Sequence, residues 1–179
     1  NTTRQALIDY PAVVPDRGRR IGIWLHADDL LPEVGPLANL TPVSVAAFSQ
    51  ELDDYHIPAL SERSIVAQEE ALADGLARSA AYFSCPTEQS THADPAACLA
   101  AWASKHGLEE VVAFAPTVGP IADLLPPVRQ RLDKSGVALT LIRRASDAHA
   151  FELAGSGFFP FWEKMSRYLH HQKNLFADL

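Results

Sequence analysis

Short apolar runs alternate along this sequence with longer segments of helical composition, and this alternation limits the possible folds more than any other feature. A strand buried on both faces of a parallel sheet reads as a nearly continuous apolar run. Such runs occur at Ile21–His26, Pro42–Phe48, Ala81–Cys85, Glu110–Ala115 and Val137–Ile142. The third run is the weakest, because Pro86 ends it. We therefore predict five short strands in a mostly parallel sheet.

Helical segments follow all of these runs except the first, after which a loop rich in Asp, Pro and Gly spans residues 28–41. The sharpest signal is Asp94-Pro95, an N-cap followed by a residue with a preset φ, with Gly107 placed where a left-handed C-cap is favoured. Pro126 and Pro127 are expected to split another segment into two short helices, because proline removes a helix hydrogen bond. The predicted helical segments are residues 64–79, 95–106, 124–132 and 158–170.

Strands separated by helices of this length imply right-handed parallel crossovers. The expected fold class is α/β, a doubly wound, Rossmann-like sheet of five mostly parallel strands in the order 3-2-1-4-5, with helices on both faces. Ligands of such sheets bind beyond the carboxyl ends of the strands. Function is therefore sought in the loops that follow the predicted strands.

Composition indicates one globular domain, expected over residues 21–170, with an extension or linker at 1–20 and a tail at 171–179. The net charge of -7 opposes direct nucleic-acid binding, which needs a basic surface, and the cluster at residues 17–20 is interpreted as a solubilising flank. No apolar run is long enough to span a membrane, and the two cysteines are expected to be reduced thiols. These features favour a cytoplasmic protein that does not bind membranes.

The motifs of common nucleotide enzymes and hydrolases are missing. Neither G-x-G-x-x-G, a Walker lysine nor G-x-S-x-G occurs. His26, Asp28 and Asp29 could bind a metal, although helix capping or solvation is the favoured interpretation. Cys85 and Cys98, with His92 between them, lack the spacing of a zinc site. We assign no catalytic and no metal-binding residue.

Several segments, in order, resemble the α/β domain of the DNA photolyase/cryptochrome family over about residues 20–165. Residues 24–30 are similar to the family's W-F-R-R-D-L-R segment, keeping the Trp and the acidic position but neither Arg. The most specific match is Gly157–Trp162, which looks like the F-T-P-F-W segment that closes the family's α/β domain. Weaker similarities lie at residues 42–48, 94–96 and 116–132.

The resemblance implies an accessory domain of a flavoprotein that performs light-dependent DNA repair or photoreception. In that family the α/β domain holds an antenna chromophore, which is a folate, a deazaflavin or a flavin, and the FAD lies in a separate helical domain. We expect this chain to be a fragment or a rearranged relative without that FAD-binding helical domain, which is then its partner in the same or another chain. Whether the chain itself is an enzyme stays open, and it is expected not to be catalytic alone.

The strand ends supply the candidate residues for such a chromophore. Ligands of doubly wound sheets bind at this place. The candidates are Trp24, Leu25, His26, Asp28, Phe48, Ser49, Pro116 and Thr117. A further aromatic group at residues 158–162 is interpreted as core in preference to a docking surface, because amphipathic aromatic helices usually pack inward.

An alternative function comes from another class of protein. The same sheet occurs in stand-alone nucleotide-binding or interaction modules of the universal-stress or electron-transfer-flavoprotein type. Bound adenine nucleotide would favour this alternative over the antenna domain.

Overall fold

The computed structural model describes residues 10–15, 17–50, 62–155 and 157–175. The chain divides into two compact units, one that ends at Ile142 and one that begins at Arg143. The first is an α/β unit and the second is a pair of helices. Each unit is described here by itself.

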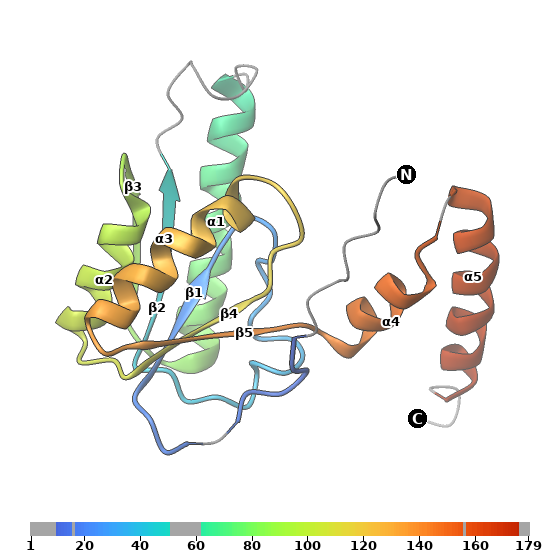
Figure 1. Cartoon of the computed structure of the whole chain (residues 1–179), viewed down its shortest axis with the longest axis horizontal. Coiled ribbons are helices and arrows are strands. Elements are labelled where there is room, and N and C mark those ends of the chain that lie inside the picture. The colour runs from blue at the N-terminus through green and yellow to red at the C-terminus, as the bar shows by residue number, and fades with distance from the viewer. Residues whose placement is uncertain (1–9, 16, 51–61, 156, 176–179) are drawn as a thin grey trace. The chain divides into compact units, whose positions relative to one another are not determined.

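The α/β unit is built on a five-stranded sheet whose strands all pair in parallel (Figure 1). The strands follow the order β3-β2-β1-β4-β5, which confirms the predicted topology. Because β1 is central, it is buried by neighbours on both sides. The strands are β1 (Ile21–Leu25), β2 (Ser44–Gln50), β3 (Thr87–His92), β4 (Glu110–Phe114) and β5 (Ala138–Ile142).

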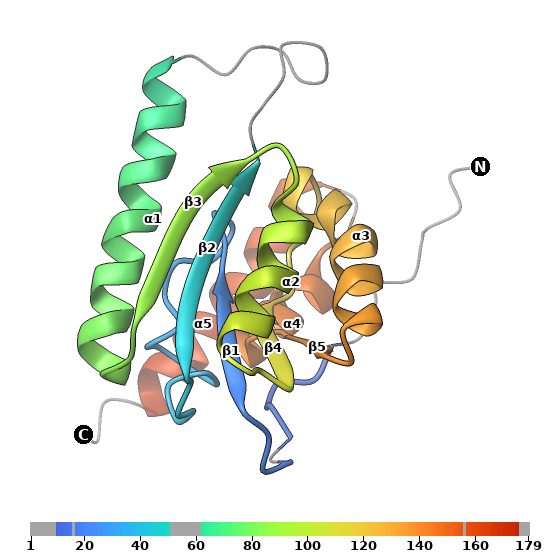
Figure 2. The same cartoon turned by 90° about the vertical axis from the view of Figure 1, so that its left-hand side faces the viewer.

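Helices cover both faces of this sheet, as expected for a doubly wound fold (Figure 2). On one face α1 (Glu62–Phe83) packs with the loop that joins β1 to β2. On the other face lie α2 (Pro95–Lys105) and α3 (Pro120–Lys134). Side chains alternate along β1, so its residues feed both cores: Trp24 contributes to the cluster under α2 and α3, and Leu25 to the cluster under α1.

One buried polar contact fixes α2 against the sheet. Trp102 of α2 donates its indole N–H to Ser44 Oγ at 3.1 Å, and Ser44 in turn donates to the carbonyl oxygen of Pro86 at 3.0 Å. Trp102 also packs against Gly22, where a Cβ atom would overlap both Trp102 and Leu108. The absence of a side chain at residue 22 therefore lets α2 approach the centre of the sheet closely.

The prediction of the third strand at Ala81–Cys85 was wrong. Residues 81–83 form the last turn of α1, and the strand lies later, at Thr87–His92. Ser84 ends the helix with a positive φ of 52°, and Pro86 prevents its continuation. The true strand is polar because it is the edge of the sheet, where no second neighbour buries it.

Other predicted elements are correct in place and differ in extent. The expected break at Pro126 and Pro127 does not occur: α3 is one continuous helix, and both prolines lie on its exposed side. The irregular connection after β1 is confirmed. A helix at Ala145–Leu153, α4, was not predicted, since none of its residues is buried and its sequence carries no apolar face.

The segment before β1 contacts the amino end of the sheet. Glu110, whose side chain is fully buried at the start of β4, is paired with Arg17 at 3.6 Å and with Arg19 at 3.5 Å. Thr140 of β5 donates a hydrogen bond to the same carboxylate. The arginines therefore compensate a buried charge, which corrects their interpretation as a solubilising flank.

The helical unit consists of α4 and α5 (Phe158–Leu175). His149 and Tyr168 pack their rings 4.1 Å apart and join the two helices. The aromatic group was expected in the core, and this expectation was wrong: Phe158, Phe159 and Trp162 are 65%, 82% and 53% exposed. None of the helices in the described part of the chain combines the length and hydropathy that a membrane crossing requires.

Candidate functional site

The carboxyl end of β1 is the point where the chain changes direction across the sheet. From β1 the chain builds outward through β2 and β3, and then returns to the other side of β1 with β4 and β5. In open parallel sheets, ligands bind at this reversal point. All the predicted site residues lie at this edge, at or just after the ends of β1, β2 and β4.

His26, the first residue after β1, connects the two central strands. Its Nε2 lies 2.8 Å from the carbonyl oxygen of Phe114, the last residue of β4. Because a carbonyl oxygen can only accept, Nε2 carries the proton. The side chain is buried, and burial lowers the pKa of His26, although the Phe114 carbonyl and the charge of Asp28 act in the opposite direction. The ring is therefore neutral at pH 7, and its Nδ1 is an acceptor.

Trp24 lies beside His26 on the same face of the sheet. The two rings meet edge to face, with centroids 5.5 Å apart. Trp24 is 2% exposed, and its indole Nε1 is a donor. Neither Trp24 Nε1 nor His26 Nδ1 has a hydrogen-bond partner within the described parts of the chain.

This pair of buried atoms is unusual, because a buried donor or acceptor without a partner costs about 1–3 kcal/mol. Trp24 offers a donor and His26 offers an acceptor. The pair therefore matches a ligand group in which an acceptor stands beside a donor. The amide-like edge of a planar heterocycle, with an N–H next to a C=O, has that pattern. The arrangement is therefore suited to binding such a heterocycle.

Comparisons with family models, with curated proteins and with solved structures found no match for this chain. The fold and the geometry of the strand ends are thus the basis for any functional argument.

The remaining predicted residues are arranged around Trp24 and His26 in different ways. Phe48 belongs to the same buried cluster as Trp24, whereas Leu25 faces the opposite core. Pro116 is buried, Ser49 is half-buried, and Asp28 and Thr117 are exposed. The structure thus brings Trp24, His26 and Phe48 together on one face and places Asp28 and Thr117 at the surface of the same edge.

Sequence reasoning did not find the part that Phe114 plays. Its contribution is a backbone carbonyl oxygen, which any residue supplies, so the side-chain sequence carries no signal for it. The predicted strands also ended one residue too late, at His26 and Ala115, so Phe114 was not recognised as the end of its strand.

Metal chemistry finds no support in the described residues. No group of three or more His, Cys, Asp or Glu side chains there could hold a metal ion. Burial raises the pKa of the Cys85 and Cys98 thiols, so both are protonated and poorly nucleophilic at pH 7.

Proposed function

We propose that this chain is the accessory α/β domain of a photolyase/cryptochrome-like flavoprotein, and that it holds an antenna chromophore at the carboxyl end of β1. The parent protein would perform light-dependent DNA repair or photoreception. The FAD would lie in a helical domain of the same or another chain, and this chain would carry no catalytic residue of its own.

The observation that carries the proposal is the pair of unpartnered buried atoms, Trp24 Nε1 and His26 Nδ1. Flavins, deazaflavins and the pterin of folates all present an N–H next to a C=O. In the proposed complex the indole N–H donates to the ligand carbonyl, and the neutral imidazole accepts from the ligand N–H. Both protein atoms are buried, so binding requires a local opening at the carboxyl end of β1.

Two further features support the same proposal. The strand order and the reversal point at β1 and β4 are those of the sheets that hold ligands at this edge. The exposed aromatic side chains of α5 suit a surface that docks on another domain, because aromatic residues are enriched in interfaces. In the proposal this surface, made of Phe158, Phe159 and Trp162, receives the FAD-binding domain.

Ligand titration of the full chain tests the proposal. Riboflavin and folic acid are added separately, and binding is followed by the change in ligand fluorescence. Trp24→Phe keeps a buried ring but removes the donor, so it should weaken binding by the value of one hydrogen bond, about 1 kcal/mol or roughly fivefold. Trp102→Phe is the matched control, because its indole N–H is already satisfied by Ser44.

The same titration separates this function from the alternative. A stand-alone nucleotide-binding module should bind AMP in preference to riboflavin and folic acid. AMP binding alone, or equal weakening of riboflavin binding by both Trp variants, would contradict the proposal.

A further inference from the structure

A groove lies between α2 and α3, outside the sheet and apart from the Trp24–His26 pair. Its volume is about 360 Å³, and it is lined by Ala100 of α2 and by Gln130, Arg131, Lys134 and Ser135 around the end of α3. This volume is at the lower limit of pockets that hold small ligands, about 300–1,000 Å³. Three of the five lining residues, Gln130, Arg131 and Lys134, carry side-chain N–H donors.

Asp94 holds one of the two cations over this groove. Its Oδ1 accepts from the N–H of Ala97 at 2.9 Å and caps α2, and its Oδ2 accepts from Nη2 of Arg131. Arg131 is thereby fixed between the helices by one nitrogen. Its Nε and Nη1 have no hydrogen-bond partner in the described residues, and they stay available to a ligand.

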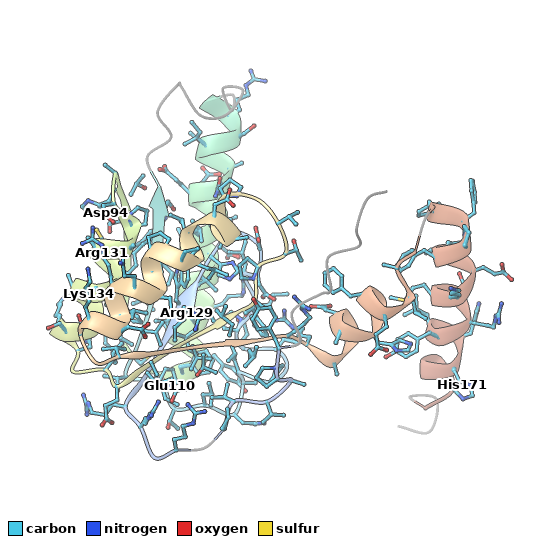
Figure 3. The ribbon with its side chains drawn as sticks, in the orientation of Figure 1. Asp94, Glu110, Arg129, Arg131, Lys134 and His171 are labelled. Carbon is cyan, nitrogen blue, oxygen red and sulfur yellow. The ribbon has the colours of Figure 1, made fainter. Side chains whose placement is uncertain are left out.

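Lys134 brings a second positive charge to the groove. It lies three residues after Arg131 and therefore on the same side of α3 (Figure 3). Among the residues described, Lys134 forms no ion pair. Cations in the last turn of a helix offset its dipole, which accounts for the sign of these charges. The helix dipole does not explain why both cations line the same groove as the amide of Gln130.

We propose that this groove binds a small phosphate group, either free or as a phosphate monoester. A tetrahedral dianion accepts hydrogen bonds in several directions, so it can bridge the guanidinium of Arg131, the ammonium of Lys134 and the amide of Gln130. The inference is independent of the chromophore site, since it uses other residues on the outside of the helical layer.

Titration of the full chain with inorganic phosphate at constant ionic strength tests the proposal, with backbone amide chemical shifts as the readout. Shifts should concentrate at Ala100, Gln130 and Ser135. Lys134→Gln should weaken phosphate binding at least fivefold, whereas Arg129→Gln should change it less than twofold. Arg129 is exposed on the same helix but does not line the groove, so it controls for the loss of one positive charge.

Three outcomes would overturn the proposal. The first is equal weakening by both variants, which would indicate diffuse electrostatic attraction. The second is the absence of shifts at the groove residues. The third is binding of acetate as tight as that of phosphate, which would show that the groove does not select a tetrahedral dianion. Thermal denaturation of Lys134→Gln checks that the variant is folded, which its exposed position favours.

Discussion

Replacing Trp24 by phenylalanine examines the unpartnered indole N–H directly, and replacing Trp102 in the same way provides the matched control. Both side chains are 2% exposed and belong to the same apolar cluster. Each substitution removes one indole N–H and the same volume. The two sites differ in one respect: Trp102 donates to Ser44, whereas Trp24 has no partner among the described residues.

The size of the expected difference follows from the cost of hydrogen bonds in a buried environment. A buried hydrogen bond contributes about 0.5–1.5 kcal/mol net, and an unsatisfied buried donor costs about 1–3 kcal/mol. Trp102→Phe loses the stabilising contribution of a hydrogen bond. Trp24→Phe removes the cost of an unsatisfied donor. The loss of volume is common to both, so Trp102→Phe should be the less stable variant by roughly 1.5–4.5 kcal/mol.

Urea denaturation followed by far-ultraviolet circular dichroism measures this difference without depending on tryptophan fluorescence. The slopes of the two transitions should agree, so that the midpoints can be compared directly. Equal stability of the two variants would mean that the Trp24 N–H has a partner in solution. That result would remove the observation on which the proposed function rests.

Four other variants probe the fold and its pH dependence. Gly22→Ala should destabilise the α/β unit by about 1–3 kcal/mol in urea denaturation, because its Cβ would overlap the side chains under α2, and wild-type stability would contradict this packing. Replacing Arg17 and Arg19 together by alanine should destabilise the protein more than Glu110→Gln does, by up to about 3–5 kcal/mol. Only the double replacement leaves the buried charge of Glu110 without cations. A larger loss of stability in Glu110→Gln would refute the pairing. Because burial lowers the pKa of His26 in the folded protein, the unfolded chain binds the extra proton first, so stability should fall as the pH drops below the ordinary histidine value of about 6.5. His26→Gln should flatten that part of a pH series of unfolding midpoints, and an unchanged slope would argue against a neutral buried ring.

The sheet topology could be predicted from the sequence because the central strands are buried on both faces and read as apolar runs. The third strand could not be found in this way. The edge strand Thr87–His92 is polar, and the apolar residues just before it are the end of a helix rich in alanine. Hydrophobic periodicity reports burial, and an edge strand has too little of it to be distinguished from a loop.

The candidate site shows a similar division between what side-chain patterns reveal and what they do not. The edge of the sheet and residues such as Trp24 and His26 followed from the strand order. The feature that distinguishes these two residues from the other candidates could not be predicted, because it depends on which polar atoms lack partners after folding. Trp102 illustrates the point: its indole is buried to the same extent as that of Trp24, yet Ser44 satisfies it.

The two units differ in how far they account for their own stability. The α/β unit buries apolar side chains on both faces of its sheet, in two separate clusters. In the described part of the helical unit no apolar side chain is fully buried, while Phe158, Phe159 and Trp162 are more than half exposed. Ordering a chain costs roughly 1.5 kcal/mol per residue, and without a buried core two helices cannot offset that cost. This balance is the physical basis for the proposal that the exposed aromatic side chains of α5 dock on another domain.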